Sequence, residues 1–227
     1  RVDSAETDTP STRSTPNGPG LRQRKLRRTR DQLIREALEL FLAQGYEHTT
    51  VEQIAEAVEV HPRTFFRHFA SKEEVALTPI SAIDEAFLAA LEVRPAGENP
   101  LQAMSGAFRA VLGRVRDGEL EGVDGALHMA MMRLVERTPG LLAEYLRRSE
   151  EMEGRLARII AAREGVDLDD DFRPRFIVAV FKAVGRVVSR EWYLRADTDL
   201  EALSVAFESA LDSLRPELFA DWRRPGA

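Results

Sequence analysis

Cysteine is absent from the 227 residues, and lysine occurs only at Lys25, Lys72 and Lys182. Without a thiol the chain forms no disulfide, no iron–sulfur cluster and no thiolate zinc site. No stretch approaches the roughly 18 uninterrupted apolar residues of a membrane-spanning helix, and the first residues contain no apolar signal segment. The sequence therefore predicts a cytoplasmic protein with no cofactor and no membrane partner.

Catalytic motifs are also missing. The four histidines, at 48, 61, 68 and 128, do not form the metalloprotease pair, and neither a Gly-rich phosphate loop nor a G-x-S-x-G motif occurs. Four acids between Asp167 and Asp171 could mimic a metal site, but they lack the glycine and the distal glutamate of a calcium loop. Negative charge at the start of the next helix explains them better. We expect no catalytic residue, no metal and no enzymatic activity.

Helical periodicity dominates the rest of the chain. Apolar residues recur three and four positions apart almost everywhere after residue 20, and alternating strand-like runs are missing. The expected helices span about 26–44, 51–58, 62–69, 72–92, 101–115, 126–136, 141–163, 172–194 and 199–214. Residues 1–20 hold Ser, Thr, Pro, Asp and Gly with little apolar surface, which predicts a disordered tail. The fold class is all-α.

Residues 50–69 have the pattern of a helix-turn-helix, with two short helices after a longer one. Thr50 can cap the first short helix, and Pro62 suits the first turn of the second. Phe65 and Phe69 lie four positions apart and would anchor the inner face of this second helix. Its outward side chains would then face a DNA major groove. They are Arg63, Thr64, Arg67 and His68.

Three motifs in residues 29–78 resemble the TetR family of bacterial transcriptional repressors. They are A-L-x-L-F-x-x-x-G-Y, T-T-V-x-x-I-A and T-F-F-R-H-F-x-S-K-E, all at the family's spacing. The resemblance implies a helix-turn-helix DNA-binding domain over 21–80 and a helical ligand-binding and dimerisation domain over 81–227. It also implies that a homodimer binds a near-palindromic double-stranded DNA operator.

The same resemblance assigns DNA contacts to individual positions. Thr50 and Lys72 would bind phosphates, whereas Arg67 and His68 would reach the backbone or flanking bases. The residues placed at the base edges are Pro62, Arg63 and Thr64. Phe66 replaces the usual tyrosine, so a phosphate contact is lost or replaced. Glu59 replaces the usual turn glycine, and a non-glycine residue at positive φ costs about 1 kcal/mol.

A basic segment precedes the helix-turn-helix. Six of the ten residues from 21 to 30 are basic and none is acidic, although the whole chain carries a net charge of −6. The entire −6 falls on residues 81–227, because residues 1–80 sum to zero. We interpret Arg24, Lys25, Arg27 and Arg28 as an arm along the DNA backbone or in the minor groove. The plainer interpretation is a solvated lead-in to the first helix.

The sequence after residue 80, which forms the body, indicates a family less specifically than the head motifs do. It resembles the branch of the mycofactocin regulator, which implies an acyl-coenzyme A or similar effector. Apolar residues of the middle helices are candidate pocket residues, although such residues are more often core. Arg133 and Arg186 could pair with an anionic ligand, although each is more often a surface or ion-pair arginine. The ligand candidates are Phe87, Met104, Phe108, Leu112, Met129, Met132, Arg133, Phe181 and Trp192.

The last two helices are expected to form the dimer through a four-helix interface. The residues assigned to that interface are Phe176, Val180, Val184, Val187, Leu203, Phe207, Ala210 and Leu214. Part of this apolar face must be protomer core, and the pattern does not divide the two.

These features predict a ligand-responsive repressor that a small hydrophobic or acyl-type effector releases from its operator. The alternative is a DNA-binding regulator whose body docks a protein partner and senses no small molecule. A ligand-sized cavity in the body would favour the first of these.

Overall fold

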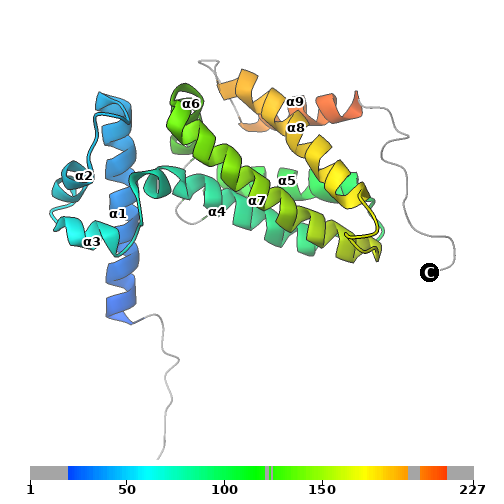
Figure 1. Ribbon diagram of the computed structural model, residues 1–227, viewed down its shortest axis with the longest axis horizontal. Coiled ribbons are helices and arrows are strands. Elements are labelled where there is room, and N and C mark those ends of the chain that lie inside the picture. The colour runs from blue at the N-terminus through cyan, green and yellow to red at the C-terminus, as the bar shows by residue number, and fades with distance from the viewer. Residues whose placement is uncertain (1–19, 121–122, 124, 194–199, 214–227) are drawn as a thin grey trace, which may run out of the picture.

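The computed structural model describes residues 20–120, 123, 125–193 and 200–213, which contain nine helices and no strand (Figure 1). The helices are α1 (Leu21–Gln44), α2 (Val51–Ala57), α3 (Pro62–Phe66), α4 (Lys72–Glu92), α5 (Pro100–Arg116), α6 (Gly125–Arg137), α7 (Pro139–Glu164), α8 (Arg173–Tyr193) and α9 (Leu200–Asp212). The all-α prediction is confirmed. The tail expected at residues 1–20 lies outside the described residues, apart from Gly20.

The first three helices form a compact head around one apolar core. Leu33 and Phe41 of α1, Ile54 of α2, Phe65 of α3 and the following Phe69 are all buried there. The rings of Phe65 and Phe69 lie 5.6 Å apart, so the pair expected to anchor α3 does pack inward. This packing holds the inner face of α3 against the core of the head.

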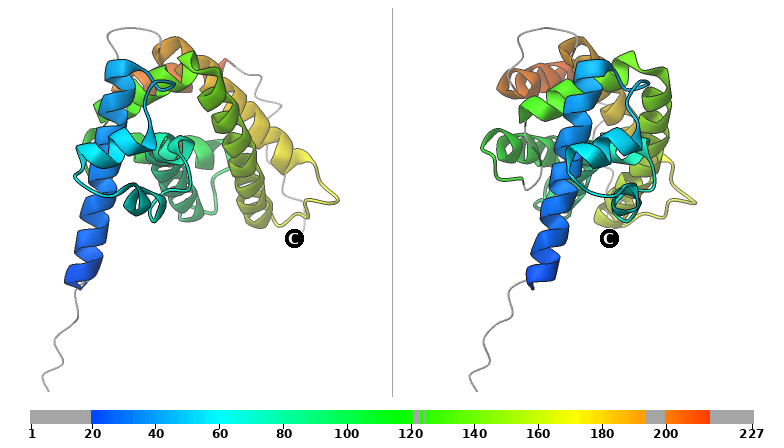
Figure 2. Two further views of the ribbon diagram at one scale, coloured as in Figure 1. Left: turned by 60° about the vertical axis from the view of Figure 1, so that its left-hand side comes forward. Right: turned by 90° about the vertical axis from the view of Figure 1, so that its left-hand side faces the viewer.

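Helix α1 begins at Leu21, five residues before the expected start. The basic segment is therefore helical, and the prediction that helix 1 starts near residue 26 was wrong. Arginine, lysine, glutamine and leucine are good helix formers, and the carbonyl of Gly20 accepts from the N–H groups of Gln23 and Arg24 at 2.7 and 3.1 Å. Both views in Figure 2 show these first turns extending past α2 and α3.

The body consists of the remaining helices, and α4 connects it to the head (Figure 1). Pro79 lies inside α4, where its missing N–H removes one helical hydrogen bond. Helix α6 also reaches the head, because its buried Met131 and Val135 belong to the same apolar cluster as Phe41 and Phe65. Among the described helices, none is long and apolar enough to cross a membrane.

Candidate functional site

Local hydrogen bonds hold the start of α2 and the turn between α2 and α3, where the N–H groups of Glu59 and Val60 donate to the carbonyls of Glu56 and Ala55, both at 2.9 Å. Thr50 and Gln53 form a capping box, in which each side chain accepts from the other's backbone N–H at 3.2 and 2.9 Å. Glu59 adopts φ 55° as expected for the turn position. His61 caps α3, because its Nδ1 accepts from the N–H of Arg63 at 3.1 Å. The sequence pattern did not indicate this role for His61.

Replacing Glu59 with glycine is expected to raise the free energy of unfolding by about 1 kcal/mol, because glycine adopts positive φ without a steric cost. Urea denaturation followed by helical circular dichroism measures the change. The control is Glu56→Gly, an exposed position inside α2, which is expected to lose about 1 kcal/mol. A destabilised Glu59→Gly variant would show that the turn carries no such strain.

Helix α3 presents a small basic and aromatic surface. Arg63, Phe66 and Arg67 are exposed, whereas Pro62 and Thr64 are half-buried. The helix ends at Phe66 rather than near residue 69, and a single further turn follows in which the N–H groups of residues 67 and 69 still donate backward. The exposed side chains have the polar, donor-rich character that base edges and phosphates require.

His68 is less available for a DNA contact than expected. Its ring packs near Phe69, and its Nε2 is buried without a hydrogen-bond partner among the described residues. Burial, with the nearby charges of Arg67 and Arg30, lowers the pKa of His68. The side chain is therefore neutral at physiological pH, which suits a phosphate contact poorly.

Lys72 joins the start of α4 to the loop between α1 and α2. Its Nζ donates to the carbonyls of Tyr46 and Thr49 at 2.8 and 3.0 Å and lies 4.1 Å from the centre of the Tyr46 ring. The Tyr46 hydroxyl donates to Glu73 at 2.6 Å, and burial together with this carboxylate raises the pKa of Tyr46. The structure thus gives Lys72 a structural role that the sequence did not predict.

The side chains of the basic segment are exposed on the projecting part of α1. Arg24, Lys25, Arg27 and Arg28 all lie there. A rigid helix carries them in place of the arm or lead-in that the sequence suggested.

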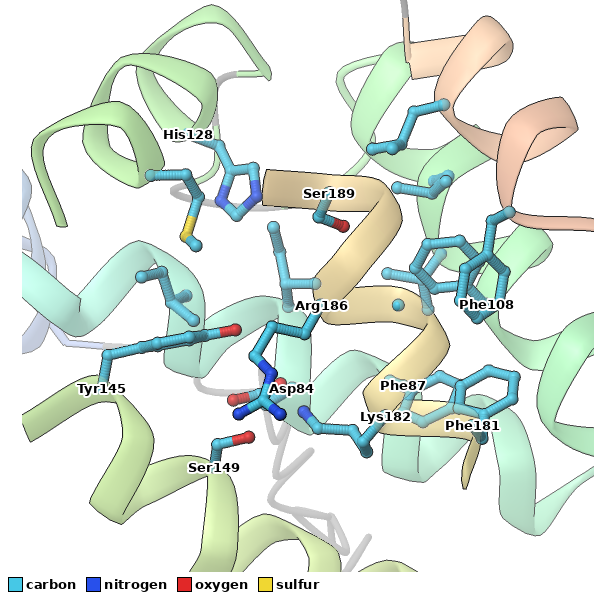
Figure 3. A pocket seen from close by; sticks show the side chains of 18 of the residues that line it. Asp84, Phe87, Phe108, His128, Tyr145, Ser149, Phe181, Lys182, Arg186 and Ser189 are labelled. Atoms are coloured by element: carbon cyan, nitrogen blue, oxygen red, sulfur yellow. The ribbon is translucent and has the colours of Figure 1, made fainter. Parts of the chain in front are cut away.

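A cavity of about 470 Å³ lies in the body, enclosed by residues of α4 to α9 (Figure 3). Five of the nine ligand candidates line it, namely Phe87, Phe108, Leu112, Met132 and Phe181. The other four, Met104, Met129, Arg133 and Trp192, are not among its lining residues. Met104 and Met129 are buried core residues instead. The prediction did not distinguish them, because helical periodicity does not separate the core side of a helix from its cavity side.

The apolar end of the cavity is an aromatic wall. Phe87 and Phe181 stack at 5.9 Å with their planes 7° apart. Phe108 lies 4.6 Å from Phe207, and Phe207 lies 5.0 Å from Phe181, edge to face. Four helices thus contribute one phenylalanine each, and these rings offer a flat apolar surface to a bound molecule.

The opposite end is polar, and sequence reasoning missed most of it. Asp84, Lys182 and Arg186 gather there with hydroxyl groups from α7 (Figure 3). The other polar lining residues are His128, Tyr145, Ser149, Glu153, Ser189 and Tyr193. These residues come from four helices, and those of α7 and of α8 recur three or four positions apart. A polar stripe at helical spacing ordinarily faces solvent, so the pattern alone did not identify it as a cavity wall.

The expected dimer residues fall into separate groups. Leu203 and Phe207 are buried in the protomer and line the cavity, so the assignment of both to a surface is corrected. Val180, Val184 and Ala210 are half-buried, and the two valines pack on the body core. Leu214 lies outside the described residues. Only Phe176, 43% exposed, and Val187, 64% exposed, present large apolar surface to solvent.

The acidic residues before α8 stabilise the start of this helix. Asp171 accepts from the backbone N–H of Arg173 at 3.0 Å and pairs with its guanidinium, as expected for charge at a helix N-terminus. In the described part of the chain, no group of three or more His, Cys, Asp or Glu residues is arranged to hold a metal ion.

Two family models match the chain. Residues 33–77 match the model of bacterial regulatory proteins of the tetR family, and residues 98–218 match the MftR C-terminal domain. A curated relative is the mycofactocin biosynthesis transcriptional regulator MftR of Mycobacterium tuberculosis, 27% identical over 76% of this chain and 84% of its own length.

Solved structures share the fold. The SmeT–triclosan complex aligns with a TM-score of 0.58 and 17% identity, over 88% of this chain and 98% of that one. The fatty acid degradation regulator FadR of Bacillus halodurans aligns with a TM-score of 0.55 and 16% identity, over 88% and 99%.

The head motifs, the helical body and these matches agree. They confirm the resemblance inferred from the motifs, including the branch to which the body was compared, and they confirm a regulatory protein rather than an enzyme. The chain belongs to the TetR family of bacterial transcriptional regulators, with a body of the MftR C-terminal type.

Proposed function

We propose that the protein is a dimeric, ligand-responsive repressor that leaves a near-palindromic operator when a small molecule enters the body. The cavity carries this proposal, because its volume of about 470 Å³ falls within the range of small-molecule sites. SmeT, which shares the fold, is described in complex with triclosan. A body that only docks a protein partner does not need such a cavity. A repressor of this kind would work in the cytoplasm.

Two helices are suited to couple the cavity to the head. Helix α4 begins at Lys72, beside the loop of the head, and carries Asp84 and Phe87 into the cavity wall. Helix α6 places Met132 in the wall and Met131 in the head core. A ligand that fits the cavity better in one arrangement of these helices would change the separation of the two heads, by no more than its difference in affinity for the two states.

The DNA-binding surface that we propose contains α3 and the projecting turns of α1. Arg63 would read a base edge, and Arg67 would contact a phosphate. Thr50, exposed at the start of α2, and Lys72 would approach phosphates beside it, Lys72 through an N–H that its two carbonyl partners do not use. The acidic body, which carries the whole net charge of −6, would be repelled by DNA and so favour a head-first approach.

Changing Arg24, Lys25, Arg27 and Arg28 together to glutamine is expected to weaken binding equally on all DNA sequences. Each phosphate contact that is lost also lowers the slope of log affinity against log salt by about one. Glutamine retains helix propensity, so α1 stays intact where a deletion would shorten it. Fluorescence anisotropy across a salt series measures both quantities. An unchanged slope would show that these residues are solvated and make no phosphate contact.

The experiment for the proposal as a whole is an operator-shift assay with and without small molecules that fit the cavity. We expect specific binding that a ligand relieves. The matched variant is Phe181→Trp, which fills the aromatic end and is expected to reduce the ligand response while leaving operator binding intact. Specific binding that no ligand relieves would contradict the sensory part of the proposal.

A further inference from the structure

The polar end of the cavity contains two acidic and two basic side chains. Asp84 of α4, Glu153 of α7, and Lys182 and Arg186 of α8 all line it. Within the described chain, none of the four makes a hydrogen bond or an ion pair. Asp84, Glu153 and Lys182 are half-buried and Arg186 is exposed, so all four charged groups remain available to a molecule that enters the cavity.

The close view shows how these groups lie. Asp84, Lys182 and Arg186 point toward one another from facing helices, with Ser149 and Tyr145 beside them (Figure 3). Burial raises the pKa of Asp84, and the charge of Lys182 offsets this only in part. Burial likewise raises the pKa of Glu153 against the charges of Lys182 and Arg186. The acids are therefore incompletely compensated by the protein itself.

A second observation comes from α6. His128 is only 8% exposed and lines the same cavity, and its Nδ1 has no hydrogen-bond partner among the described residues. Burial lowers the pKa of His128 to about 4, so the imidazole is neutral and can both donate and accept. The cavity thus contains an unused polar group on a helix separate from the four charged residues.

We propose that the effector is amphiphilic, with a zwitterionic group, an ammonium beside a carboxylate, at one end and an aryl group at the other. The zwitterionic group binds Asp84, Glu153, Lys182 and Arg186, and the aryl group lies on the aromatic wall. The acids bind the ammonium, and Lys182 and Arg186 bind the carboxylate through charge-assisted hydrogen bonds. The charged group of the effector would connect α4 to α8 through Asp84 and Arg186, while its aryl part packs on the aromatic wall. This inference rests on the proposed effector cavity and names the chemistry of its ligand.

The test is isothermal titration of the full chain with three probes that share a phenylalkyl body. Homophenylalanine carries both charges, phenylbutanoate only the carboxylate, and phenylpropylamine only the ammonium. We expect homophenylalanine to bind about tenfold or more tightly than either singly charged probe, since each lost charge-assisted contact costs on the order of one such factor.

Two variants that each remove one charge assign the contacts. Asp84→Asn is expected to remove the preference for homophenylalanine over phenylbutanoate, and Arg186→Gln the preference over phenylpropylamine. The controls are Asp170→Asn and Arg158→Gln, which are exposed positions outside the cavity lining and are expected to change neither preference.

The contrary outcomes are distinct. Equal affinity for the three probes, variants that change nothing, or no binding of any probe would overturn the zwitterion assignment. If an uncharged apolar molecule then releases the operator, the proposed repressor stands and only its ligand class is wrong. If operator binding itself is absent, the proposed function fails instead.

Discussion

Operator affinity is expected to fall by about 1–3 kcal/mol when Arg63 is replaced by alanine, and discrimination between the cognate and altered bases at one position should relax. Arg63 is exposed in the first turn of α3, and its backbone N–H is already fixed by the His61 cap. Its guanidinium is therefore presented from a capped helix start, and arginine most often reads a base through a bidentate contact to guanine.

The matched comparison is Arg67→Ala, the exposed arginine that follows α3. It is expected to weaken binding evenly across sequences, as a lost phosphate contact does. Competition binding with single-base operator variants measures both effects. If Arg63→Ala lost affinity equally on every sequence, Arg63 would be a phosphate contact and the base-reading residue would lie elsewhere on the head.

The second large effect is expected at Val187, which is 64% exposed on α8. Phe176, which is 43% exposed, lies on the same helix, and the two residues form the apolar surface that we propose for the dimer. In a two-fold symmetric interface, Val187→Asp buries two unpaired carboxylates, each costing several kcal/mol. The dimer is therefore expected to dissociate.

Dissociation would also reduce operator binding by about 100-fold or more, because the two heads would no longer bind as a linked pair. Analytical ultracentrifugation measures the mass, and fluorescence anisotropy measures the affinity. The control is Val93→Asp, an exposed valine that follows α4 and is 81% exposed. A Val187→Asp protein that stays dimeric would place the interface on another surface.

The sequence was most informative where a pattern has one structural meaning. The head motifs required Phe65 and Phe69 inside and Arg63 outside, and the structure has this arrangement. Glu59 was expected at positive φ because the resemblance places it where the family usually has a turn glycine, and its φ is 55°. Features of this kind depend on residues that are close in the sequence, so they can be predicted without knowledge of the tertiary fold.

The sequence was least informative where one pattern has several meanings. Leu203 and Phe207 have the same spacing that an interface residue would have, yet the packing of α9 on α8 buries them. The start of α1 was missed because residues 21–30 have no apolar stripe, so periodicity gives no signal there. Of the charged residues at the polar end of the cavity only Arg186 was named from the sequence, because Asp84 and Arg186 become neighbours only after α4 and α8 pack around the cavity.

The most direct test of the central claim is selection of fragments of the source genome by the full-length protein, followed by footprinting of the recovered site. We predict protection of a near-palindromic sequence by one dimer, loss of that protection with Arg63→Ala, and its relief by a molecule that occupies the cavity. Recovery of fragments with no common sequence, bound no better than random DNA at the same salt concentration, would contradict the account.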